Sequence, residues 1–97
     1  MENKKYIEIA KLCEYYQVPE GFFLELEEVG LLEPPVLDVQ HQAIDEDYLS
    51  ELEKIMRLRY DLEINMQGIE TVLQLLDKIR DLENELALLK KQLKIYQ

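Results

Sequence analysis

Few residues in this sequence carry the chemistry of a catalytic or metal-binding centre. There is one cysteine, Cys13, and one histidine, His41. No histidine lies near Cys13 in the sequence to activate its thiol, and we interpret Cys13 as a packing residue on an apolar helix face. His41 stands in a polar stretch and cannot form a multi-histidine metal site alone, so we interpret it as a solvated loop residue.

Three consecutive acids, Asp45, Glu46 and Asp47, are the other group with the chemistry of a cation site. A calcium loop needs oxygen ligands at spaced positions and a glycine at its turn, and neither follows this run. The acids fit the first turn of a helix instead, where Asp45 caps backbone N–H groups and all three favour the helix dipole. The sequence also lacks a Ser/His/Asp set, a phosphate-binding loop and a cysteine pair. We therefore expect no enzyme activity, no metal and no cofactor.

Charge divides the chain into two unlike parts. The formal net charge is −10. Residues 1–53 hold three lysines against fourteen acids, a balance of −11, whereas residues 54–97 hold eight basic residues against seven acids, a balance of +1. An acidic surface repels phosphate backbones and attracts basic proteins. We therefore expect a protein partner and no binding to nucleic acid.

The composition favours a folded cytoplasmic protein. A hydrophobic fraction of 47% is ordinary for a globular chain. No stretch of about 18 apolar residues predicts a membrane span, and residues 1–5 lack the apolar core of a secretory signal. A single cysteine forms no intramolecular disulfide, which suits a reducing compartment.

Apolar spacing predicts two short helices near the start of the chain. The first spans residues 6–16, because its apolar positions recur at steps of three and four. Pro19 begins the second helix, over residues 20–29, and Gly30 ends it. Of four aromatic residues in this region, we expect two to pack between the helices and two to be available as interface anchors: Tyr15, Tyr16, Phe22 and Phe23.

Residues 36–44 alternate weakly and predict a short extended wing. Asp45 then caps a third helix that runs to about Leu62, with Ile44 and Leu49 as a hydrophobic staple around the cap. Asn65 is placed to cap the last helix. These signals predict an all-α protein with a compact acidic module over residues 1–64 and a long helix over residues 65–97.

The last helix carries an uninterrupted heptad pattern. Its apolar residues alternate steps of three and four over more than three heptads, as in the a and d positions of a coiled coil. A helix over residues 66–96 reaches roughly 45 Å at about 1.5 Å per residue, which is longer than a 65-residue module can cover. We therefore predict that it pairs with a second copy of the chain. The predicted dimer residues are Val72, Leu75, Ile79, Leu82, Leu86, Leu89, Leu93 and Tyr96.

Taken in order, these segments resemble a known architecture. The order helix, turn, helix, wing, helix and long coil is similar to the MerR-like winged helix-turn-helix superfamily. Within it, the chain resembles the chaperone modulator CbpM family over nearly its whole length. The first resemblance is carried by residues 9–13, Val18, residues 29–34 and residues 47–52, and the second by Arg57-Leu58-Arg59, Asp61-Leu62, Ile64-Asn65, Gly68-Ile69 and residues 73–79.

Departures from the MerR pattern bear on function. MerR regulators carry Arg-Tyr-Tyr-Glu in the second helix, where the arginine reaches DNA, whereas this chain has Leu24-Glu25-Leu26-Glu27. Their wing carries Tyr-Arg, and the matching residues here are His41-Gln42. Carboxylates presented to a polyanion are repelled by it.

Resemblance to the CbpM family implies a homodimer that binds the J-domain of a DnaJ-like (CbpA-type) co-chaperone and restrains its activity. Such J-domains carry a basic helix, which the acidic second helix of this chain would mask. The alternative is a MerR-like DNA-binding transcriptional regulator, and the same acids also fit an ordinary solvated helix face. The residues expected to bind the partner are Glu20, Leu24, Glu25, Glu27 and Glu28.

Overall fold

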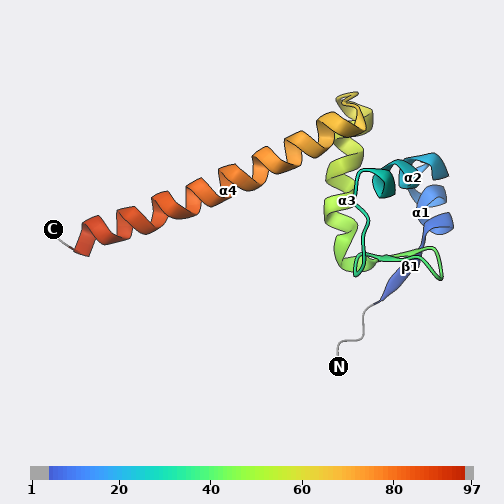
Figure 1. Cartoon of the computed structure of the whole chain (residues 1–97), viewed down its shortest axis with the longest axis horizontal. Coiled ribbons are helices and arrows are strands. Elements are labelled where there is room, and N and C mark those ends of the chain that lie inside the picture. Colours follow the sequence, from blue (N-terminus) through green and yellow to red (C-terminus); the bar gives the residue numbers. More distant parts are fainter. Residues whose placement is uncertain (1–4, 96–97) are drawn as a thin grey trace.

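A computed structural model describes residues 5–95 of the chain. A small module holds three short strands and three helices, and one long helix projects from it as an arm (Figure 1). The molecule measures 57 × 39 × 21 Å along its principal axes. The elements in chain order are β1 (Tyr6–Glu8), α1 (Ile9–Tyr16), α2 (Glu20–Glu28), β2 (Leu37–Asp38), β3 (Ala43–Asp45), η1 (Glu46–Tyr48), α3 (Leu49–Met56), η2 (Arg57–Asp61) and α4 (Met66–Ile95).

Helices α1 and α2 form a helix-turn-helix whose ends are fixed by local capping. The residue after α1, Gln17, has a left-handed backbone with φ 57°, and the next N–H, of Val18, donates to the Cys13 carbonyl at 3.1 Å. Gly30 follows α2 with φ 79° and donates to Glu27, while Leu31 donates to Leu26. This pair of bonds is the Schellman arrangement that the glycine predicted.

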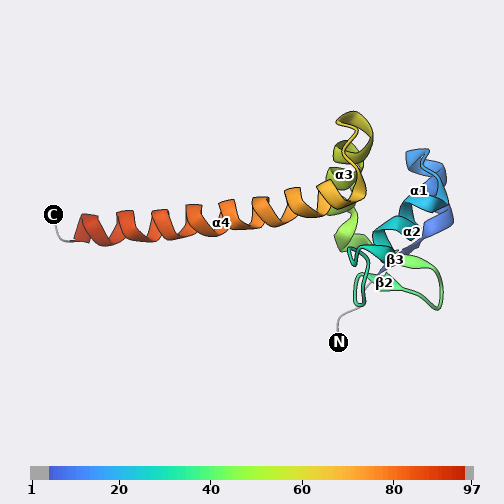
Figure 2. The same cartoon turned by 45° about the horizontal axis from the view of Figure 1, so that its top comes forward.

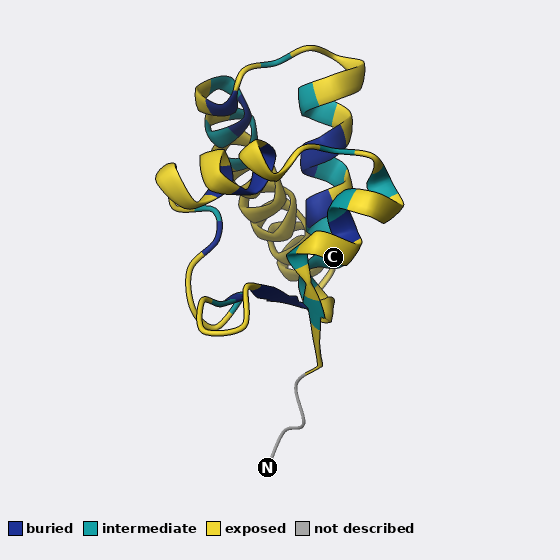
Figure 3. Ribbon diagram, turned by 90° about the vertical axis from the view of Figure 1, so that its right-hand side faces the viewer, coloured by how far each residue is buried: buried dark blue, intermediate teal, exposed yellow. Residues whose placement is uncertain are grey.

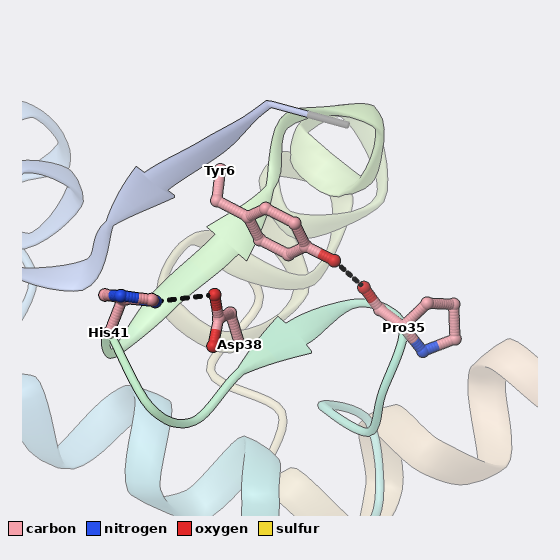
Figure 4. Close-up of polar contacts among 4 residues, drawn as sticks. All are labelled: Tyr6, Pro35, Asp38 and His41. Carbon is pink, nitrogen blue, oxygen red and sulfur yellow. Dashed lines mark hydrogen bonds and ion pairs between the residues drawn. The ribbon is translucent and has the colours of Figure 1, made fainter. Parts of the chain in front are cut away.

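The expectation of an all-α chain is wrong in one respect, because a three-stranded antiparallel sheet covers one end of the module (Figure 2). Strand β3 lies between β1 and β2, and Ile44 is opposite both Ile7 and Leu37. The predicted first helix therefore begins three residues late, at Ile9. Tyr6 fits the apolar spacing of the helix that follows, which is why the helix was predicted to include it. Its backbone instead pairs with β3, and its hydroxyl donates to the Pro35 carbonyl at 2.8 Å (Figure 4).

The predicted third helix is a continuous but composite rod. Its cap is as expected, since the Asp45 carboxylate accepts a bond from the Asp47 N–H at 2.9 Å. The rod begins as the 3-10 turn η1, continues as α3 and ends as the π-helix η2. The cap of α4 is also as predicted, because Asn65 Oδ1 accepts from the Gly68 N–H at 2.8 Å.

The core lies where α2, β3, α3 and the start of α4 meet (Figure 3). Phe22, Phe23 and Leu26 on α2 are almost fully buried, and their two phenyl rings meet edge to face at 5.3 Å. The two phenylalanines thus take the packing role expected of two aromatic residues. The other buried apolar residues are Leu12, Leu32, Leu37, Ala43, Ile44, Leu52, Ile55, Met56, Met66 and Ile69.

Only the first turns of α4 touch the module. Met66 and Ile69 are buried and Leu73 is half-buried against the core, whereas every described residue from 74 to 95 is exposed. Of the predicted dimer residues, Val72 is half-buried and Tyr96 lies outside the described residues. The others form an exposed apolar stripe along the arm: Leu75, Ile79, Leu82, Leu86, Leu89 and Leu93.

Two glycines in helices give opposite expectations for substitution by alanine. A Cβ at Gly68 would lie 2.7 Å from Ile64 Cγ2 and 3.1 Å from the Asn65 cap, whereas a Cβ at Gly21 would meet nothing within 4 Å. We expect Gly68→Ala to lower the free energy of unfolding by about 1 kcal/mol or more through overpacking. Gly21→Ala should raise it by roughly 0.4–1 kcal/mol by restricting the unfolded chain.

Urea unfolding of both variants at one protein concentration checks this pair. A Gly68→Ala protein as stable as the parent would show that the start of α4 has room that the structure does not give it.

Candidate partner-binding surface

The predicted partner-binding residues all lie on α2, and the set Glu20, Leu24, Glu25, Glu27 and Glu28 is named here the α2 acidic surface. The structure gathers part of this set around one hollow. Glu20, Leu24 and Glu27 follow one another at steps of four and three, so they share a face of α2. They line a hollow of about 160 Å³. The start of α1 and the wing complete its walls through Ile9, Ala10 and Gln42, with Phe23 behind them. Leu24 is 59% exposed, so an apolar side chain stands between two carboxylates at this face.

The remaining two residues of that prediction are placed differently. Glu28 is exposed and does not line the hollow. Glu25 lies toward the other side of α2, where its charge raises the pKa of Tyr60, although burial is the larger cause and Arg59 opposes both. The five predicted residues are thus spread over more than one face of the helix.

None of the four glutamates is neutralised by a neighbour. Within residues 5–95, the ion pairs join Lys54 to Glu51, Arg80 to Asp77 and His41 to Asp38, and none of them reaches α2. All four α2 glutamates are exposed to solvent. This face therefore presents an acidic field with no basic group within it, which attracts a basic partner.

A larger hollow, named here the α1–α3 groove, was not predicted from the sequence. It has a volume of about 590 Å³ and lies between the C-terminal end of α1 and the end of the α3–η2 rod. Both of these ends point away from the sheet (Figure 1). Its lining residues are Tyr16, Gln17, Val18, Glu53, Met56, Arg57, Tyr60 and Asp61.

Two tyrosines give the groove its fixed walls. The Tyr16 hydroxyl donates to Glu53 Oε2 at 3.0 Å, and burial together with this bond raises the pKa of Tyr16 to about 12. Tyr16 therefore stays a neutral donor throughout the physiological range. The Tyr60 ring packs on Phe22 with centroids 5.7 Å apart. The Arg59 guanidinium lies over the Tyr60 ring, with its central carbon 5.5 Å from the ring centroid.

Cys13 and His41, the two residues with reactive side chains, lie in ordinary structural surroundings. Cys13 is half-buried against the core, and burial raises the pKa of its thiol, which makes it a poor nucleophile near neutral pH. His41 is exposed in the wing, with Nδ1 2.9 Å from the Asp38 carboxylate, as Figure 4 shows. That contact lowers the pKa of Asp38. The part of the chain that the structure describes contains no group of three acidic, histidine or cysteine side chains arranged to hold a metal.

No helix within residues 5–95 is both long enough and apolar enough to cross a membrane. The module thus presents an acidic face on α2 and a mixed polar and apolar groove at the end of α1.

Known proteins agree with this architecture. The model of the MerR HTH family regulatory proteins matches residues 7–91. A chaperone modulatory protein CbpM from Pseudomonas entomophila (strain L48) is 25% identical over 87 residues, which cover 90% of this chain and 86% of the relative. Another from Escherichia coli O1:K1 / APEC is 27% identical over 85 residues, covering 88% of this chain and 84% of the relative. No solved structure matches the chain.

These matches confirm the resemblance on which the sequence was interpreted, and they extend over the helix-turn-helix, the wing and most of α4. The names of the relatives support a role as a chaperone modulator. The chain belongs to the MerR HTH family of regulatory proteins and, within it, to the CbpM family.

Proposed function

We propose that the protein restrains a DnaJ-like (CbpA-type) co-chaperone in the cytoplasm by binding its J-domain through the α2 acidic surface. The observation that carries this proposal is the set of exposed, unpaired carboxylates on α2 around the apolar side chain of Leu24. Since its relatives are named as chaperone modulators, a component of a chaperone system is the partner that fits best.

Charge explains how such a surface would compete for a J-domain. Its basic helix would be drawn by long-range attraction to a module that carries −11 over residues 1–53. Exposed charges chiefly raise the association rate, so binding should slow as salt screens the attraction. A basic helix occupied in this way is not free to dock elsewhere, which restrains the co-chaperone.

Charge reversal on α2 tests the proposal. We expect Glu27→Lys with Glu28→Lys to abolish J-domain binding in calorimetry, because it replaces attraction with repulsion at an exposed face. Asp77→Lys with Asp81→Lys on the arm makes the same change in net charge and should leave the affinity nearly unchanged. Full affinity in the α2 variant would place the interface elsewhere. The next candidates are the exposed residues Glu8, at the end of β1, and Lys11 and Tyr15 on α1.

We further propose that α4 pairs with the same helix of a second copy, so that residues 65–97 serve dimerisation and residues 1–64 serve partner binding. The exposed stripe on α4 is the support for this step. Beyond the first turns, the helix has no module surface to lie on, and isolated apolar stripes of this length mark interaction surfaces. Pairing by knobs-into-holes packing would cover it.

Leu86 lies in the middle of the stripe and tests the pairing. Leu86→Asp should shift the protein from dimer to monomer in sedimentation at tens of micromolar, because a charge in the seam costs on the order of a few kcal/mol. Asn84→Asp adds the same charge off the stripe and should leave the dimer intact. A parent protein that sediments as a monomer would rule out this use of α4.

A DNA-binding regulator is the second candidate, because the matching family consists of helix-turn-helix regulatory proteins. The fold offers α2 and the wing to a duplex, but α2 bears Glu20, Glu25, Glu27 and Glu28 and no basic residue. Phosphate contacts made by Lys and Arg supply most of the affinity of DNA readers.

We therefore expect no mobility shift with mixed genomic fragments at roughly micromolar protein and physiological salt, the range in which basic DNA readers bind. A sequence-specific shift under these conditions would favour the regulator over the chaperone modulator.

A further inference from the structure

We propose that the α1–α3 groove is a second contact for the same partner, into which a mixed-charge protein segment inserts an apolar side chain. This inference rests on the J-domain binding proposed above and extends the contact from the α2 acidic surface to the groove. The segment would present a basic side chain and an acidic side chain on either side of its apolar anchor.

The shape and place of the groove suit an inserted side chain. It is several times larger than the hollow beside Leu24, at about 590 Å³ against about 160 Å³. Its walls come from two rigid elements, the end of α1 and the α3–η2 rod. No described residue of α4 lines it. The π-helix at its edge is a feature that often marks functional positions.

The apolar and aromatic residues that line the groove are already ordered. Met56 is buried, Val18 and Tyr16 are half-buried, and Tyr60 is 43% exposed. The bond from Tyr16 to Glu53 and the packing of Tyr60 on Phe22 fix both rings before a partner arrives. Ordered tyrosine and arginine side chains at the centre of a contact carry much of the binding energy in protein interfaces.

The rim of the groove carries exposed charges of both signs. Arg57 and Asp61 are exposed, and neither makes a side-chain hydrogen bond or an ion pair with another residue of the range 5–95. Glu53 accepts a hydrogen bond from the Tyr16 hydroxyl through Oε2. Its other oxygen makes no hydrogen bond with another residue of the range 5–95. A basic side chain of the partner would meet Glu53 and Asp61, and an acidic one would meet Arg57.

Glu25 connects this groove to the α2 acidic surface. Tyr60 lines the groove, and the Glu25 charge adds to the burial that raises the pKa of Tyr60, while Glu20, Leu24 and Glu27 line the hollow beside the wing. The α2 acidic surface then supplies long-range attraction and the groove supplies short-range contacts. Exposed charges alter association rates, and contacts that lose water on binding alter dissociation rates.

The test uses the full chain and a recombinant J-domain from a DnaJ-like co-chaperone of the same organism. Nuclear magnetic resonance titration of the labelled chain should shift the amides of Gln17, Val18 and Asp61. Arg57→Glu should weaken binding by about tenfold or more, chiefly through faster dissociation. Lys54→Glu makes the same charge change on the same rod, where Lys54 pairs with Glu51 outside the groove, and should change the affinity less than threefold or so.

Three outcomes distinguish the groove contact from the proposed function on which it rests. A parent chain that does not bind the J-domain contradicts the proposed function and the groove contact together. Binding that shifts only residues 20–28 and is unaffected by Arg57→Glu leaves the proposed function standing and overturns the groove contact. Equal losses in Arg57→Glu and Lys54→Glu would also overturn it, because the effect would then be one of net charge.

Discussion

Burial of the inner face of α2 is the interaction on which the rest of the module depends. Phe22, Phe23 and Leu26 are almost fully buried, and they join α2 to the core formed with β3 and α3. Full burial of each such side chain contributes roughly 1.5–3 kcal/mol relative to exposure. Because this contribution fixes α2 from one side, the other side is free to carry glutamates without any structural partner. The same helix is thus both the main core element and the most acidic exposed surface.

Local signals made much of this fold predictable. Pro19, Gly30, Asp45 and Asn65 set the ends of α2, of the α3 rod and of α4, and each acts through bonds to residues close by in the chain. The α4 stripe was also readable, since its period depends only on residues of one helix. Strand β1 was missed because its partner β3 lies far along the chain. Tyr6 satisfies the helical spacing, and only tertiary pairing assigns it to a strand.

The candidate site divides in the same way. Helical geometry alone predicts that Glu20, Leu24, Glu27 and Glu28 share one side of α2, and the structure brings the first three around one hollow but leaves Glu28 outside it. The same geometry turns Glu25 away from that side, but only packing shows that its charge acts on Tyr60. The α1–α3 groove was beyond sequence reasoning altogether, because it forms where residues 16–18 meet residues 53–61 through packing. The π-helical turn at its edge has no signature in apolar spacing.

Charge, more than fold, decides what this helix-turn-helix can recognise. In a DNA reader of this architecture, α2 and the wing face a polyanion, and basic side chains release counterions from it. Here α2 and the wing are both present, but from Leu12 to Glu53 the chain has no lysine or arginine. Its first basic residues after that stretch are Lys54 in α3 and Arg57 and Arg59 in η2. Under the proposed function, a partner that carries both signs of charge would meet an acidic face and a mixed groove at once, whereas α2 offers no basic residue to a phosphate backbone.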